Sequence, residues 1–139
     1  MPVIVVTRLR LRDPALLDEF FTDAVAAIEQ AQKAEGNLGA DALADAHNAW
    51  WSVTAWQDRA LMQAYVDAEP HLGIRARLDH YCDEATFADW EQASPDLPDW
   101  QTSWRHLTAD GKAGQLTQAS AANQTRDFPP PVVPPPSVR

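Results

Sequence analysis

His71 is the side chain of this sequence that is best suited to acid–base chemistry. It shares one apolar face with Ile74, Leu78 and Cys82 on a helix that we predict to begin at Pro70. An imidazole changes its charge near neutral pH, so His71 could serve as the acid–base group of a pocket. The alternative is a buried or half-buried histidine that hydrogen-bonds to the backbone.

Other chemistries find less support. The four histidines show no H-x-x-x-H or H-E-x-x-H spacing, so we predict no metal site. Cys82 is the only cysteine and has no activating neighbour beyond His80, which indicates a buried structural thiol. Ser52 has no G-x-S-x-G context, so nucleophilic catalysis is not indicated. Tyr65 is the second candidate for proton transfer.

The stretch AWWSVTAW, residues 49–56, holds three of the six tryptophans. In a β-strand, neighbouring side chains point to opposite faces. One parity carries two tryptophans and two hydroxyl groups: Trp50, Ser52, Thr54 and Trp56. The other parity carries Trp51 and Val53, so we expect both faces of this strand to be covered.

The elements that must position these residues follow from apolar periodicity and capping residues. We predict strands over 2–11 and, weakly, over 38–45, together with the tryptophan strand and a weak last strand over 112–120. Helices are predicted to begin at Asp13, Asp58, Pro70, Asp83 and Asp99. The short helix from Asp83 would carry Phe87 and Trp90.

This order is that of a ferredoxin-like split βαβ fold of the α+β class, with extra helices before the last strand. Its antiparallel sheet has helices on one face, and a partner subunit would cover the other. We expect Arg8 and Arg10, at the end of the first strand, to be solvated. The alternative for Arg8 is an anion contact in a pocket.

Residues 1–120 are interpreted as one domain, because a chain of 139 residues can bury a sizeable core. Residues 121–139 hold most of the eleven prolines, which predicts a semi-rigid extended tail. The alternatives are an arm that docks on its own or the partner subunit, or a ligand for a proline-binding module.

The bulk properties exclude some partners. A net charge of −9 would repel a phosphate backbone, so nucleic acid is an unsuitable partner. No segment approaches the ~20 apolar residues of a membrane span, and the first residues lack the charge order of a signal peptide. A single cysteine fits a reducing compartment, so we expect a cytoplasmic protein.

The stretch WWSVTAWQDRALMQAYVDAEPH, residues 50–71, resembles the third strand and second helix of the dimeric α+β barrel superfamily, and within it the antibiotic biosynthesis monooxygenase group. The resemblance spans about residues 1–80 and treats 81–110 as a helical insertion. It implies a homodimer in which two sheets pack face to face across Trp51 and Val53. The parity of Trp56, shared with Ser52, Thr54 and Trp50, would then face a pocket beneath the helices.

Cofactor-free monooxygenases of this group oxidise phenols, and the substrate anion itself reduces O₂. The pattern has a tryptophan at Trp56, which this chain retains. It has Asn at the position of Ser52, Tyr at that of Met62 and Arg at that of Ala76, so three positions depart. Arg75 and Arg77 flank the last of these and are candidates for contact with an anion.

The resemblance therefore implies a homodimer that binds a small apolar or aromatic ligand, and a cofactor-independent monooxygenase acting on an aromatic or phenolic substrate. Trp56, Ser52, Thr54, Trp50 and Met62 would shape the substrate site. The alternative is a non-catalytic binding or scaffold module, which the departures favour. A third possibility is haem binding through His71, although the usual axial position falls near Arg75.

Overall fold

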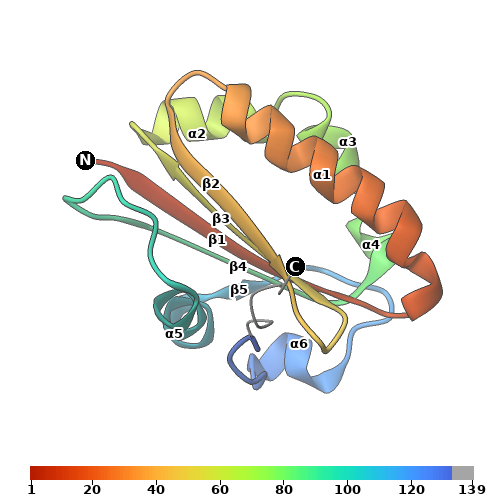
Figure 1. Ribbon diagram of the computed structural model, residues 1–139. Helices are drawn as coiled ribbons and strands as arrows, with labels where there is room; N and C mark the ends of the chain where they lie inside the picture. The colour runs from red at the N-terminus through yellow and green to blue at the C-terminus, as the bar shows by residue number, and fades with distance from the viewer. Residues whose placement is uncertain (133–139) are drawn as a thin grey trace, which may run out of the picture.

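A computed structural model of the chain describes residues 1–132 and shows one antiparallel sheet with helices packed on it (Figure 1). The strands are β1 (Val3–Leu11), β2 (Asn37–Ala44), β3 (Ala49–Trp56), β4 (Cys82–Glu91) and β5 (Lys112–Ala113). Their order across the sheet is β2-β3-β1-β4-β5, and each neighbouring pair is antiparallel. The α+β class and the ferredoxin-like order are thus confirmed.

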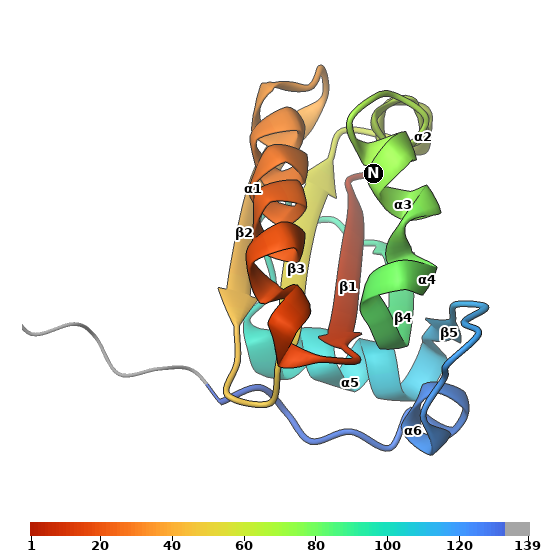
Figure 2. The ribbon, with the colours of Figure 1, turned by 90° about the vertical axis from the view of Figure 1, so that its right-hand side faces the viewer.

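Most helices of the described chain lie on one face of the sheet, which we call the first face; the opposite face is the second face. These are the 3-10 helix η1 (Pro14–Leu16), α1 (Leu17–Lys33), α2 (Arg59–Val66), α3 (His71–Ala76) and α4 (Leu78–Tyr81). Figure 2 shows α1 in front of β2 and β3, with α2, α3 and α4 forming a second column. Two further helices, α5 (Trp100–Asp110) and α6 (Ala121–Thr125), follow β4.

Aspartates begin three of these helices as the sequence predicts. The carboxylates of Asp13, Asp58 and Asp99 accept hydrogen bonds from backbone N–H groups at the starts of η1, α2 and α5. Gly36 follows α1 with a φ of +84°, and a Cβ there would lie 2.5 Å from a side-chain atom of Leu61. Glycine is therefore required where the chain turns from α1 into β2.

The prediction of a short helix from Asp83 is wrong, because residues 82–91 form β4. This strand pairs with β1 over nearly its whole length, with Thr7 opposite Phe87 and Ile4 opposite Trp90. The three-residue spacing of Phe87 and Trp90 fits a helix face, but the two rings point to opposite faces of a strand. Pairing with β1 therefore determines the secondary structure of this segment, because its local spacing fits either a helix or a strand. The predicted last strand is reduced to Lys112–Ala113.

The second face of the sheet is covered by the chain itself. Trp51 and Val53 are 0% and 1% exposed, in a core cluster that also includes Leu107 of α5 and Phe128. The Phe128 ring lies edge-on to Trp51 at 5.9 Å, and the Trp104 indole N–H donates to the Phe128 carbonyl at 2.9 Å. Figure 1 shows α5 on the side of the sheet opposite α1. We expected a partner subunit to cover Trp51 and Val53, and this expectation is corrected because α5 and Phe128 of the same chain cover them.

The first part of the predicted tail packs on the sheet. Asn123 of α6 accepts from the Ala85 backbone N–H at 2.8 Å and donates to the Gly114 carbonyl at 3.1 Å. Phe128 is 5% exposed, so the chain is anchored on both sides of Asp127. Residues 133–139, the remainder of the predicted proline-rich tail, lie outside the described residues.

Arg8 is buried rather than solvated, and it does not reach a pocket. Its side chain points to the second face, where its Nη1 donates to Glu84 at 2.9 Å. Arg8 and Glu84 are 2% and 3% exposed, and Arg10 also binds Glu84 at 2.8 Å. The Phe128 ring lies over the Arg8 guanidinium at 4.2 Å. This charge is accommodated because a carboxylate and aromatic rings surround it.

Within residues 1–132, no helix is both long and apolar enough to cross a membrane.

Candidate functional site

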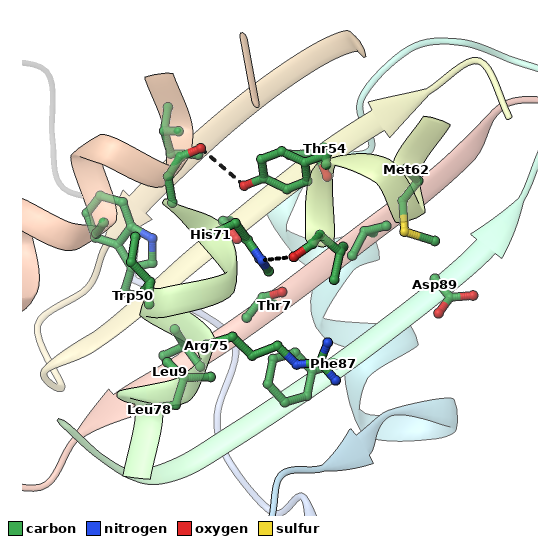
Figure 3. Close-up of a pocket in the computed structure, with 18 of the residues that line it drawn as sticks. Thr7, Leu9, Trp50, Thr54, Met62, His71, Arg75, Leu78, Phe87 and Asp89 are labelled. Carbon is green, nitrogen blue, oxygen red and sulfur yellow. Dashed lines mark hydrogen bonds between the residues drawn. The ribbon is translucent and has the colours of Figure 1, made fainter. Parts of the chain in front are cut away.

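A cavity of about 370 Å³ lies between the first face of the sheet and helices α1, α2 and α3. The odd-numbered side chains of β1 and even-numbered side chains of β3 form its floor, while Phe20 and Ala24 of α1 line one wall. Figure 3 shows Leu9 and Leu78 toward one end, Met62 and Asp89 toward the other. Its volume and mostly apolar lining suit a small organic ligand.

The floor is ordered in rows by the strand register. Thr7 is directly opposite Ser52 on one side and Phe87 on the other. In the next row, Val5 stands between Thr54 and Asp89. Trp50 and Trp56 lie two residues beyond these hydroxyls on β3, so the polar floor is enclosed between two indoles.

Three aromatic rings form a column at the Trp56 end. Trp56 is fully buried and stacks on Tyr65 with 4.8 Å between ring centroids, and Tyr65 contacts the His71 ring at the same distance. The Trp56 indole N–H donates to the Thr54 hydroxyl at 2.8 Å, which fixes the ring on its own strand. The column therefore connects the floor of the cavity to helix α3.

One hydrogen bond holds the backbone of His71, and another holds its ring. Its backbone N–H donates to the Gln30 side-chain oxygen of α1 at 2.8 Å, and its Nδ1 lies 3.1 Å from the Val66 carbonyl. A carbonyl can only accept, so Nδ1 carries a hydrogen and Nε2 has a free lone pair when the ring is neutral. Burial lowers the pKa of His71, and the charge of Arg75 lowers it further against the opposing effect of Val66.

Tyr65 is a poorer proton acceptor than His71. Its hydroxyl donates to the Ala27 carbonyl at 3.1 Å, and burial raises its pKa to about 12. The phenol therefore keeps its proton at neutral pH, and that proton already has a partner on α1. Both predicted proton-transfer residues line the cavity, but it is His71 Nε2 that has a lone pair without a hydrogen-bond partner within residues 1–132.

The two predicted anion contacts differ in position. Arg75 lines the cavity and reaches from α3 in the direction of Phe87 (Figure 3), and it forms no ion pair with any residue in 1–132. Arg77 is not a lining residue. Its guanidinium binds both carboxylate oxygens of Asp23 at 3.0 Å, and Tyr81 donates to the same carboxylate at 2.6 Å.

The remaining predicted substrate contacts all border the cavity: Trp50, Ser52, Thr54, Trp56 and Met62. Sequence reasoning missed Thr7, Phe87 and Asp89. Thr7 carried a signal, because it is the one polar residue among the apolar side chains of its parity in β1. Phe87 and Asp89 gave no such signal in the sequence, because their segment was predicted to be a helix.

No group of three or more His, Cys, Asp and Glu side chains is arranged to hold a metal ion in the part of the chain that the structure describes. Cys82 is buried, and burial raises the pKa of its thiol to about 12. The thiol is therefore protonated at neutral pH, and its burial is what the sequence indicates.

Comparison with solved structures places the fold among known proteins. A conserved protein from Methanosarcina mazei is 17% identical, with 66% of this chain and 93% of that chain covered and a TM-score of 0.60. A putative antibiotic biosynthesis monooxygenase from Nitrosomonas europaea is 15% identical, with coverage of 68% and 92% and a TM-score of 0.61. SnoaB of Streptomyces nogalater, a cofactor-independent oxygenase, is 14% identical, with coverage of 70% and 98% and a TM-score of 0.56.

No curated protein matches the chain at a significant level. The sequence model of the antibiotic biosynthesis monooxygenase family, however, matches residues 2–77. These residues contain β1, β2, β3 and the helices that enclose the cavity. The chain therefore belongs to the antibiotic biosynthesis monooxygenase family.

Proposed function

We propose that the cavity binds a small phenolic aromatic molecule and that the chain oxidises it with O₂ without a cofactor, His71 acting as general base. The observation that carries this proposal is the state of His71. Its Nδ1–H is bound to Val66, its ring is neutral at pH 7, and its Nε2 lone pair is unused within residues 1–132. A neutral imidazole beside an apolar cavity is suited to remove a weakly acidic proton.

An anthrone-type phenol illustrates the chemistry. Removal of one proton from its ring CH₂ group gives an electron-rich anion, which transfers an electron to O₂ and then forms a carbon–oxygen bond as a peroxide. Loss of water from the peroxide leaves a quinone. One oxygen atom of O₂ thus becomes the new carbonyl and the other leaves in water, so the substrate supplies all the electrons.

The other cavity residues have roles that fit this reaction. The Trp50 and Trp56 indoles provide flat apolar surfaces for an aromatic ring. Arg75 lies at the edge of the cavity, has no ion-pair partner among the described residues, and would stabilise the substrate anion. Met62 stands where the resemblance expects a tyrosine, so His71 takes the proton-transfer role that Met62 cannot perform.

Oxygen uptake by purified, metal-free protein with 1,8-dihydroxyanthrone tests the proposal. We expect turnover above the uncatalysed oxidation, and with ¹⁸O₂ one labelled atom in the quinone. His71→Asn should reduce kcat by about 10²–10⁴-fold, the usual contribution of a general base. His47→Asn, at an exposed turn outside the cavity, is the matched control and should retain the activity.

Equal activity in both variants would exclude His71 as the base. Saturable binding of the anthrone without oxygen uptake would instead support the non-catalytic binding module, which the departures at Ser52, Met62 and Ala76 favour. The same protein preparation therefore separates the two functions.

A further inference from the structure

We propose that Gln30 of α1 is a positioning residue for His71. Its side-chain amide fixes the turn between α2 and α3 and thereby sets which nitrogen of the imidazole carries the hydrogen. The inference rests on the proposed function, which makes His71 the base. Gln30 does not line the cavity but lines an outer groove between α1 and α2, so it acts through His71 and not on the ligand.

The amide of Gln30 joins three backbone groups in the segment between α2 and α3. Its Nε2 donates to the carbonyl oxygens of Tyr65 at 3.2 Å and Ala68 at 3.3 Å. Its Oε1 accepts from the backbone N–H of His71 at 2.8 Å. A primary amide has two N–H hydrogens and one carbonyl oxygen, so each of these groups has a partner here. A side chain with any other set of donors and acceptors would leave at least one of the three backbone groups unsatisfied.

The backbone N–H of His71 depends on Gln30. The first N–H groups of a helix have no partner within the helix, and Pro70, at the start of α3, provides no side-chain cap. The next two N–H groups of α3 are bound by residues of its own segment. The His71 N–H is instead bound from α1, which lies across the outer groove, so Gln30 ties the start of α3 to another helix.

The segment that Gln30 holds contains both members of the hydrogen bond that sets the tautomer. The Val66 carbonyl accepts from His71 Nδ1 at 3.1 Å, and Val66 directly follows Tyr65, whose carbonyl is bound by Gln30. The Tyr65 hydroxyl is bound as well, by the Ala27 carbonyl one turn earlier on α1. One helix therefore holds the acceptor side and the donor side of the Val66–His71 contact in place.

Loss of this support would change the chemistry of the ring. A neutral imidazole that nothing restrains carries its hydrogen mainly on Nε2 in water. In that form Nε2 is a donor and cannot take a proton from a ligand. Holding the hydrogen on Nδ1 is thus what makes Nε2 basic, and the amide of Gln30 favours this state without touching the ring.

The ¹⁵N NMR shifts of the His71 ring in the ligand-free protein test the inference, because they report which nitrogen carries the hydrogen. At about pH 8 the ring is neutral, and we expect the Nδ1–H form in the wild-type protein. Gln30→Met removes all three hydrogen bonds at similar side-chain length, and Gln30→Glu removes both donors while it preserves the shape. In both variants the Nε2–H form should become the major one.

Gln32→Met is the matched control, because Gln32 is exposed on the same helix, and it should keep the wild-type tautomer. With 1,8-dihydroxyanthrone, both Gln30 variants should lower kcat about 3–10-fold, the usual effect of a lost hydrogen bond or two. KM should stay within about twofold, because Gln30 does not line the cavity. Thermal unfolding verifies that each variant is folded.

The outcomes separate this inference from the proposed function. Retention of the Nδ1–H form in either Gln30 variant would overturn the inference, as would a changed tautomer with unchanged kcat. The same loss of the Nδ1–H form in Gln32→Met would also overturn it, because the effect would then be a general one of α1. The tautomer is measured without substrate, so absence of turnover by a wild-type protein in the Nδ1–H form would overturn the proposed function alone.

Discussion

His71 Nδ1 lies 3.1 Å from the carbonyl oxygen of Val66, and this contact decides which ring nitrogen can accept a proton. The bond runs from α3 back to the end of α2, so the two helices orient the imidazole together. Gln30 of α1 holds the His71 backbone N–H and also donates to the Tyr65 carbonyl. The basic nitrogen is thus fixed by the same helices that enclose the cavity.

The pH dependence of oxidation should report the pKa of His71. Only the neutral ring can take a proton, and burial lowers its pKa from the ordinary 6.5. Because the folded pKa is lowered, the active form persists below pH 6.5, and kcat/KM should fall only at more acidic pH. A steady-state pH profile measures this. A profile whose acidic limb lies above 6.5, or one unchanged in His71→Asn, would contradict the assignment.

Arg75 should control the affinity for anionic ligands. Its guanidinium borders the cavity and has no ion-pair partner within the described residues, whereas Arg77 is engaged by Asp23. We expect Arg75→Gln to weaken binding of a phenolate ligand by about 3–10-fold at low salt, with less effect at high salt because the charge is partly screened. Titration at two ionic strengths measures this.

The matched control for Arg75→Gln is Arg105→Gln, which removes the same charge from the exposed surface of α5 on the other face of the sheet. It should leave the affinity unchanged. Since the charge of Arg75 lowers the pKa of His71, Arg75→Gln should also raise that pKa and shift the acidic limb toward higher pH. Equal effects of the two variants would indicate a general charge effect instead.

The parity of the tryptophan strand could be predicted from the sequence because alternation along a strand depends only on backbone geometry. It assigned Trp50, Ser52, Thr54 and Trp56 to one face and Trp51 to the other, as the structure has them. The aspartate caps could also be predicted, since capping is a local interaction of a side chain with the next few N–H groups.

The remaining features depend on contacts between distant segments. Phe87 and Asp89 entered the site only because β4 pairs with β1, which spacing within residues 82–91 does not encode. The buried state of Arg8 depends on Glu84, 76 residues away. The position of α5 was equally hidden, because Leu107 packs in one cluster with Trp51 and Phe128, which are distant from it in the sequence.

Glu84 should be among the residues most important for stability. It is the carboxylate that faces both Arg8 and Arg10, and Arg8 Nε has no partner within residues 1–132. Removing one member of a buried ion pair leaves an uncompensated charge, so Glu84→Gln should lower the free energy of unfolding by about 3–5 kcal/mol. Urea denaturation measures this change.

Glu91→Gln is the control, because Glu91 is exposed at the end of the same strand, and its effect should stay within about 0.5 kcal/mol. Burial raises the pKa of Glu84, but the hydrogen bonds and charges of Arg8 and Arg10 outweigh it, so the pKa is lowered below 4.5. The stabilisation is therefore present above pH 4.5 and lost as the pH falls through the folded pKa. A Glu84→Gln protein as stable as wild type would show that Arg8 finds another partner.

Phe128 should stabilise the cover of the second face. Its ring is 5% exposed and contacts both Trp51 and the Arg8 guanidinium, while its carbonyl accepts from Trp104. Truncating a buried phenylalanine costs about 3–5 kcal/mol, so Phe128→Ala should lower the free energy of unfolding by an amount in that range. The exposed Pro130→Ala in the same segment is the control and should have little effect.

The same variant tests how the second face is used. Without the Phe128 ring, Trp51 becomes accessible, so its fluorescence should shift to longer wavelength and be quenched more by acrylamide. Exposed apolar surface favours association, and sedimentation velocity should therefore show more self-association in Phe128→Ala than in wild type. Two sheets could pack face to face across Trp51 and Val53 only if α5 and Phe128 moved away. A wild-type dimer in which α5 and Phe128 become accessible to solvent would show that this rearrangement takes place.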